Sequence, residues 1–135
     1  MNSQDIVNEE LQTLKWNDVD EYPSFKTCKS LSSKQESKQC FETTLITHIT
    51  NKLSDEIIVV TENVEDTVVI KFHISETGNL SVLNIKNKET TKEQIPHLDS
   101  LLIKSLDSLP RIFPAIKRGQ QVKTEFTLPI VIQMN

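Results

Sequence analysis

The clearest hydrophobic pattern lies at the end of the chain, where apolar and polar residues alternate one by one. One face carries Val122, Thr124, Phe126, Leu128, Ile130 and Ile132, and the other carries Lys123, Glu125, Thr127 and Pro129. A period of two is typical of a strand with one buried face. We therefore predict one long strand over residues 122–132, which follows a proline-containing turn and a basic loop ending at Gly119.

A second pattern predicts a long helix in the first half of the chain. The apolar residues that recur at every fourth position are Phe41, Leu45, Ile49 and Leu53. This spacing places them in one stripe on a helix that faces the core. Ser33 and Glu36 have the spacing of a capping box, in which the serine hydroxyl accepts a hydrogen bond from the Glu36 N–H. We predict that the helix begins there.

The middle of the chain predicts a β-hairpin. Residues 68–74 alternate between apolar and other side chains, and Ser75–Asn79 has the composition of a turn, in which Gly78 can adopt positive φ. Alternation resumes at Leu80 and shifts by one residue at Leu83, as at a β-bulge or a twist. The β-branched run over residues 56–61 leaves two interpretations open, a short strand or a link between helix and sheet.

A second helix is predicted over residues 91–109. Its apolar face carries Leu98, Leu101, Leu102, Leu106 and Leu109. Pro96 suits the first turn, where its missing N–H costs least, and Pro110 ends the helix. Asp99 would lie near the positive end of the helix dipole.

These elements together predict the fold class. Each predicted helix and strand has one apolar face, and the economical arrangement is an α+β two-layer sandwich, an antiparallel sheet with helices packed on one face. We assign residues 25–135 to this domain. Residues 1–24 form an N-terminal arm, for which we expect a short amphipathic helix at Ile6–Trp16.

Charge and hydropathy narrow the range of partners. The 135 residues include 15 Lys and Arg against 19 Asp and Glu, a formal net charge of −4. Binding to nucleic-acid phosphates needs a concentrated basic face, so no nucleic-acid partner is expected. The small cluster at Lys117–Arg118 is interpreted as a solvated turn. No apolar run approaches the roughly 20 residues that a membrane helix needs.

The compartment depends on the start of the chain and on its cysteines. The first ten residues are polar and lack the apolar core of a signal peptide. Two expectations stay open, a cytoplasmic protein or a periplasmic or envelope protein whose export signal or lipid anchor precedes Met1. We favour the second, because the close pair Cys28 and Cys40 suits a disulfide in an oxidising compartment. The alternative is two free thiols, with Cys40 on a helix face.

Candidate catalytic and metal-binding side chains form no recognisable motif. His48, His73 and His97 lie on three different predicted elements, and neither they nor the cysteines have the tight spacing of zinc ligands. Cys40 and His48 would share a helix about 12 Å apart along its axis, too far for a nucleophile and its base. No carboxylate stands in an apolar segment and both glycines lie in turns. The sequence therefore predicts no enzyme, no metal and no cofactor.

Most of the chain resembles the C-terminal periplasmic domain of TonB-type energy transducers. The matching segments are residues 67–74, 75–79, 105–110, 113–119 and 122–130, and residues 22–28 and 39–41 are similar to a cysteine-containing segment of Bacteroidetes members. The resemblance implies a two-layer α/β domain that binds a short segment of an outer-membrane receptor by adding a strand to its sheet.

The resemblance also implies where a partner would bind. The matching sheet edge is Gln121, Val122, Lys123, Thr124, Glu125, Phe126 and Thr127. Pro129 cannot donate to a β-ladder, so we expect a partner strand to pair before it. We expect a non-enzymatic protein-binding module of the periplasm or cell envelope. One alternative is the excised domain of a true energy transducer in outer-membrane transport, and another is a small ligand-binding protein or enzyme.

Overall fold

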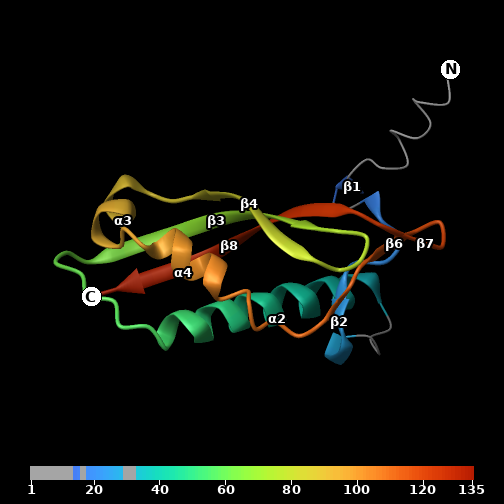
Figure 1. Ribbon diagram of the computed structural model, residues 1–135, viewed down its shortest axis with the longest axis horizontal. Coiled ribbons are helices and arrows are strands. Elements are labelled where there is room, and N and C mark those ends of the chain that lie inside the picture. Colours follow the sequence, from blue (N-terminus) through green and yellow to red (C-terminus); the bar gives the residue numbers. More distant parts are fainter. Residues whose placement is uncertain (1–13, 16–17, 29–32) are drawn as a thin grey trace, which may run out of the picture. The chain divides into compact units, whose positions relative to one another are not determined.

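The computed structural model describes residues 14–15, 18–28 and 33–135 and shows a mixed α+β protein (Figure 1). Its helices are η2 Lys26–Cys28 (a 3-10 helix), α2 Lys34–Ser54, α3 Glu89–Gln94 and α4 Leu98–Lys104. Its strands are β1 Leu14–Lys15, β2 Ser24–Phe25, β3 Val64–Ile74, β4 Leu80–Lys86, β5 Ile112–Phe113, β6 Ala115–Lys117, β7 Gln120–Val122 and β8 Thr124–Met134. The predicted α+β class is confirmed.

The described residues belong to two compact units. The first unit consists of three segments: the described residues up to Phe41, His73–Ser81 and Arg111–Phe126. The second consists of Glu42–Phe72, Val82–Pro110 and Thr127–Asn135. Each unit is described by itself below.

Helix α2 begins and buries its side chains as its sequence predicts. The N–H of Glu36 donates to the hydroxyl of Ser33 over 3.0 Å, so the serine caps the helix. The four residues of the predicted stripe, Phe41, Leu45, Ile49 and Leu53, are all buried. The segment that follows α2 contains no strand, so of the two interpretations left open for residues 56–61 the link is correct.

The main sheet has the strand order β1-β8-β3-β4. In β3 and β8 every second residue is buried and the residues between are exposed or half-buried, which confirms strands with one buried face. One feature was predicted wrongly: β1 pairs parallel to β8, with Leu14 opposite Thr124, so the sheet is not purely antiparallel. Leu14–Lys15 is therefore a strand, and the rest of the helix expected at the N-terminus lies outside the described residues.

The predicted hairpin is present as β3 and β4, joined by the turn Ser75–Asn79. The hydroxyl of Ser75 accepts hydrogen bonds from the N–H groups of Thr77 and Asn79. Gly78 has a φ of +90°, and a Cβ there would collide with the carbonyl oxygen of Ile112. The turn therefore needs glycine for its backbone angle and for the close approach of another segment.

The single helix predicted for residues 91–109 is instead two short helices, α3 and α4. They are separated by Ile95–His97, and Pro96 lies in the break rather than in the first turn of a longer helix. A residue before proline avoids the helical region, and Ile95 has φ −130° and ψ 75°. Asp99 does lie in the first turn of α4, as predicted.

The long final strand is likewise divided, because Lys123 separates β7 from β8. Strands β6 and β7 form a small hairpin in which Lys117 is opposite Gln120. The two residues between them, Arg118 and Gly119, have φ angles of +52° and +76°. Positive φ at both central positions defines a tight type I′ turn, which suits right-twisted strands. The basic cluster is thus part of a hairpin turn.

Candidate functional site

The backbone of the predicted partner edge is largely occupied by the chain itself. Gln121 and Val122 lie in β7 and pair with β6. Thr124 and Glu125 pair with β1, and the carbonyl of Lys123 accepts a hydrogen bond of 2.9 Å from the N–H of Leu14. These five residues of the predicted edge are therefore already paired within the chain. Partner binding itself stays a prediction.

Phe126 and Thr127, the last two residues of the predicted edge, differ in exposure. Phe126 is buried, and its ring meets that of Phe41 edge to face with 5.8 Å between centroids. Its side chain therefore belongs to the core of the first unit. Thr127 is exposed and begins the part of β8 that lies in the second unit. Thr127 is the member of the predicted set whose exposure suits contact with a partner.

The direction of the β8 backbone defines which of its groups could receive a partner. Successive residues of a strand point their N–H and C=O groups to opposite sides. The carbonyl of Lys123 points to the β1 side, so Thr127, Pro129, Val131 and Gln133 share that direction. In the described residues, β1 is two residues long and pairs only with Thr124 and Glu125. The β1 side of β8 thus has no described strand opposite Thr127–Gln133.

The exposed face at this end of β8 contains an open hollow of about 430 Å³. The residues that line it are Glu65, Asp66, Thr67, Lys88, Val131, Ile132 and Gln133. The amide of Gln133 donates to the carboxylate of Glu65 over 3.1 Å, and Val131 is 70% exposed. The hollow offers an apolar side chain, that of Val131, bordered by polar groups, and it lies along the part of β8 that has no described strand on its β1 side.

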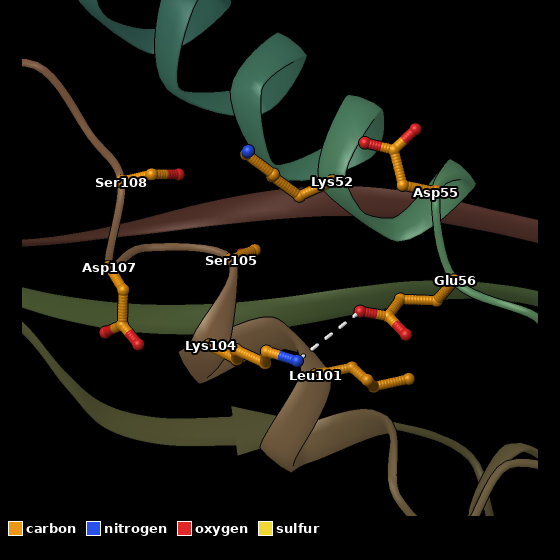
Figure 2. Close-up of a pocket in the computed structure, with 8 residues that line it drawn as sticks. All are labelled: Lys52, Asp55, Glu56, Leu101, Lys104, Ser105, Asp107 and Ser108. Carbon is orange, nitrogen blue, oxygen red and sulfur yellow. Dashed lines mark ion pairs between the residues drawn. The ribbon is translucent and has the colours of Figure 1, made fainter.

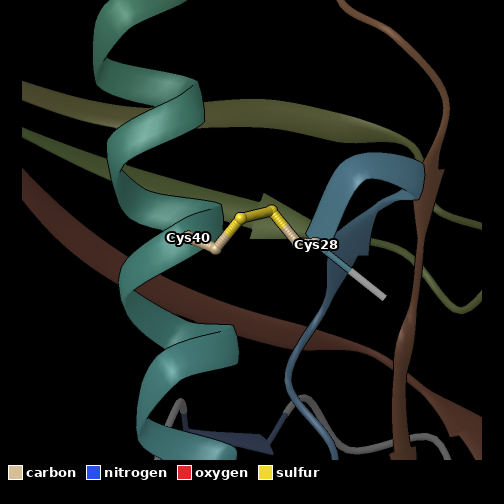
Figure 3. The surroundings of a disulfide bond; sticks show 2 residues. All are labelled: Cys28 and Cys40. Carbon is tan, nitrogen blue, oxygen red and sulfur yellow. A yellow bond between two sulfur atoms is a disulfide. The ribbon is translucent and has the colours of Figure 1, made fainter. Parts of the chain in front are cut away.

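The two cysteines form the disulfide that the sequence favoured (Figure 3). Cys28, at the end of η2, and Cys40, in α2, have Cα atoms 5.8 Å apart, within the range of unstrained bridges. Phe25, three residues before Cys28, and Phe41, directly after Cys40, stack with 5.0 Å between ring centroids. The bridge therefore joins two segments that also share the aromatic core of the first unit.

A buried carboxylate that no sequence pattern marked holds the start of α3. Asp66 in β3 is 8% exposed, and its Oδ2 accepts hydrogen bonds from the N–H of Lys88 over 2.8 Å and the hydroxyl of Thr91 over 2.7 Å. Burial raises the pKa of the Asp66 carboxyl, but these hydrogen bonds and the charge of Lys88 outweigh it and keep the pKa below its usual range. This carboxylate acts as a cap from outside the helix.

His48 and Ser108 lie close together, but their geometry does not make an activated nucleophile. The Nε2 atom of His48 lies 2.9 Å from the carbonyl oxygen of Ser105 and 3.3 Å from the hydroxyl of Ser108. A carbonyl oxygen only accepts, so Nε2 carries a hydrogen and donates it there. That nitrogen is then unable to take a proton from Ser108. His48 fastens α2 to the end of α4.

The hollow beside these residues is lined by side chains of both charges (Figure 2). It has a volume of about 360 Å³ and is lined by Lys52, Asp55, Glu56, Leu101, Lys104, Ser105, Asp107 and Ser108. The one ion pair drawn across it joins Lys104 and Glu56 at 3.8 Å. The lining contains two basic and three acidic side chains, so its charges do not favour a particular small ion.

The described part of the chain contains no cluster of three or more histidine, cysteine, aspartate or glutamate side chains that would hold a metal ion. His48, His73 and His97 lie on α2, on β3 and before α4. Among the described helices, none combines the length and the hydropathy that crossing a membrane would require.

A further exposed feature is the link between α2 and β3. Ile57 and Val59 are 94% and 80% exposed, the highest values among the large apolar side chains of the described residues. The sequence showed this run as β-branched and left its structure open. Its exposure could not be read from composition, because such a run usually lies inside a sheet.

Comparison with protein-family models, with curated proteins and with solved structures finds no match to this chain.

Proposed function

We propose that this chain is a non-enzymatic protein-binding module that receives an extended partner segment on the β1 side of β8, at Thr127–Gln133. The observation that carries the proposal is the run of outward-directed backbone groups there, with no described strand opposite them. Addition of a strand is a common mode of peptide recognition in which backbone hydrogen bonds supply affinity. The exposed Val131 and the hollow beside it would supply side-chain contacts.

Pro129 shapes this site in a way that its sequence position alone does not reveal. Its ring nitrogen shares the outward direction and donates no hydrogen bond, which protects an exposed edge against unwanted pairing. A partner would therefore pair with Thr127, Val131 and Gln133. At Pro129 only the carbonyl oxygen could take part, as a hydrogen-bond acceptor. Compared with the sequence-based expectation, the proposed site moves from before Pro129 to both sides of it.

We further propose the two-layer architecture of TonB C-terminal domains and a location in the periplasm or cell envelope. The single buried face of β3 and β8 and the apolar stripe of α2 support the layers. The Cys28–Cys40 bridge supports an oxidising compartment, because the cytosol keeps most thiols reduced. The partner class that follows from the resemblance is a segment of an outer-membrane receptor.

Amide chemical shifts under titration test the proposal. Short peptides from the N-terminal segments of outer-membrane receptors are added to the labelled protein. We expect shifts at Thr127, Val131 and Gln133, and weaker binding by Val131→Pro, which removes an outward N–H. Val131→Thr keeps that N–H and is the matched control. Shifts confined to Gln121–Glu125 would instead mean that a partner replaces β1, and shifts only around His48 would favour a ligand-binding protein.

A further inference from the structure

The link Ile57–Val60 is an exposed apolar segment of the second unit without regular secondary structure. Exposure alternates along it: Ile57 and Val59 are 94% and 80% exposed, whereas Ile58 and Val60 are half-buried. Alternation with a period of two is the side-chain pattern of an extended chain. Two of the four branched side chains thus point to solvent while the other two rest on the protein.

Both ends of the link are fixed. Before it, the N–H of Glu56 donates to the carbonyl of Leu53 over 3.1 Å, and the Glu56 carboxylate pairs with Lys104. After it, the side-chain oxygen of Gln94 accepts from the N–H and hydroxyl of Thr61, at 2.8 and 3.1 Å, and from the N–H of Glu62 at 3.1 Å. A segment held at both ends loses less conformational entropy when it binds.

The backbone of Ile57–Val60 makes no hydrogen bond to any described residue, although four β-branched residues in a row favour a sheet. An exposed extended segment with free N–H and C=O groups is a template for pairing with another strand. Exposed apolar side chains and unpaired backbone therefore coincide at one place.

The surrounding charge indicates what kind of strand would pair there. Asp55 and Glu56 precede the link and Glu62 follows it. The second unit contains ten acidic and six basic residues, so it accounts for the net charge of −4 of the whole chain. If two copies paired antiparallel through this link, Asp55 would oppose Glu62 at both ends, and like charges opposite one another destabilise a sheet. A second copy is thus a poor partner.

We propose that Ile57–Val60 is a second strand-pairing site, whose partner is an extended segment of another protein with branched apolar residues flanked by Lys or Arg. The apolar residues of the partner cover Ile57 and Val59, its backbone pairs with the link, and its basic residues meet Asp55 and Glu62. The proposal does not depend on the β8 site, which uses other residues of the chain.

A titration with designed peptides tests this site in the full chain. The first peptide has a Val-Thr-Val-Thr core flanked by two lysines on each side, and the second has the same core flanked by glutamates. We expect the lysine peptide alone to bind, with amide shifts centred on Ile57–Val60. The double variant Ile57→Ser with Val59→Ser should raise Kd about tenfold or more, since contacts of two branched side chains are lost.

Matched controls separate binding at this site from nonspecific apolar binding and from binding at the β8 site. Leu83→Ser with Ile103→Ser removes two other exposed apolar side chains and should leave the affinity unchanged. Val59→Pro, which removes one N–H from the link, should weaken binding. Equal binding of the two peptides, shifts outside residues 55–62, no binding, or a dimer in sedimentation that Val59→Pro abolishes would each overturn the proposal.

Discussion

The carboxylate of Asp66 in β3 accepts a hydrogen bond of 2.7 Å from the hydroxyl of Thr91, which is 1% exposed. Thr91 lies in the first turn of α3, whose first residues lack intrahelical partners for their N–H groups. The same carboxylate oxygen also accepts from the N–H of Lys88, the residue before the helix. A strand residue thereby supplies the cap that Lys88 itself does not provide.

Replacement of Asp66 by alanine should destabilise the protein by about 1–3 kcal/mol, because it leaves the buried Thr91 hydroxyl without a partner. Urea unfolding measures the change in the free energy of unfolding. Asp107→Ala removes an exposed carboxylate and should change that energy by no more than about 0.5 kcal/mol. Equal effects of the two substitutions would contradict the capping role.

The same carboxylate should make stability depend on pH in the acid range. The pKa of Asp66 is lower in the folded protein than its usual value, so its charged form favours folding. This contribution is fully present above the unfolded pKa of about 3.9 and is lost as the pH falls through the folded pKa. The difference in urea midpoint between the wild type and Asp66→Asn should therefore shrink on acidification. A difference that grows would contradict the direction of the shift.

The sequence predicted elements better than it predicted their ends and their pairing. The stripe of α2 and its Ser33 cap, the hairpin turn at Gly78 and the single buried face of β8 are local patterns, and all are present. The break at Ile95–His97 followed from the residue before a proline, a local rule that an apolar stripe of leucines obscured.

These local patterns could not predict which distant segments pair with each other. The parallel contact of Leu14 with Thr124 joins residues that are far apart in the sequence, and it gives the first part of β8 a described neighbour on its β1 side. The capping of α3 by Asp66 is also a contact between segments, and the local pattern around Asp66, which follows Glu65, gave no signal of it. For this reason the proposed partner site differs from the predicted one, and it lies at Thr127–Gln133 instead of Gln121–Thr127.

Loss of the disulfide should destabilise the protein by about 3 kcal/mol, because an unbridged unfolded chain regains the freedom of the loop between Cys28 and Cys40. The double variant Cys28→Ala with Cys40→Ala, compared with the wild type in urea, measures this loss. The wild type with a reducing agent should unfold at nearly the same urea concentration as the variant. A reducing agent that shifts the variant as much as the wild type would show that the effect has another origin.

The hydroxyl of Thr124 should lower the stability of the folded protein. Thr124 is fully buried in β8, and its Oγ1 has no hydrogen-bond partner among the described residues. A buried hydroxyl without a partner costs roughly 1–3 kcal/mol, and valine has nearly the same shape without the hydroxyl. Thr124→Val is therefore expected to raise the free energy of unfolding by about 1 kcal/mol.

Two further variants decide whether the hydroxyl is the cause. Thr124→Ser keeps the hydroxyl and removes a buried methyl group, so it should destabilise by about 1 kcal/mol. Thr67→Val makes the same chemical change at an exposed position of β3 and should have little effect. If Thr124→Val destabilised the protein instead, Oγ1 would have a partner, such as a buried water, that stabilises the fold, and the strand would need its hydroxyl at that point.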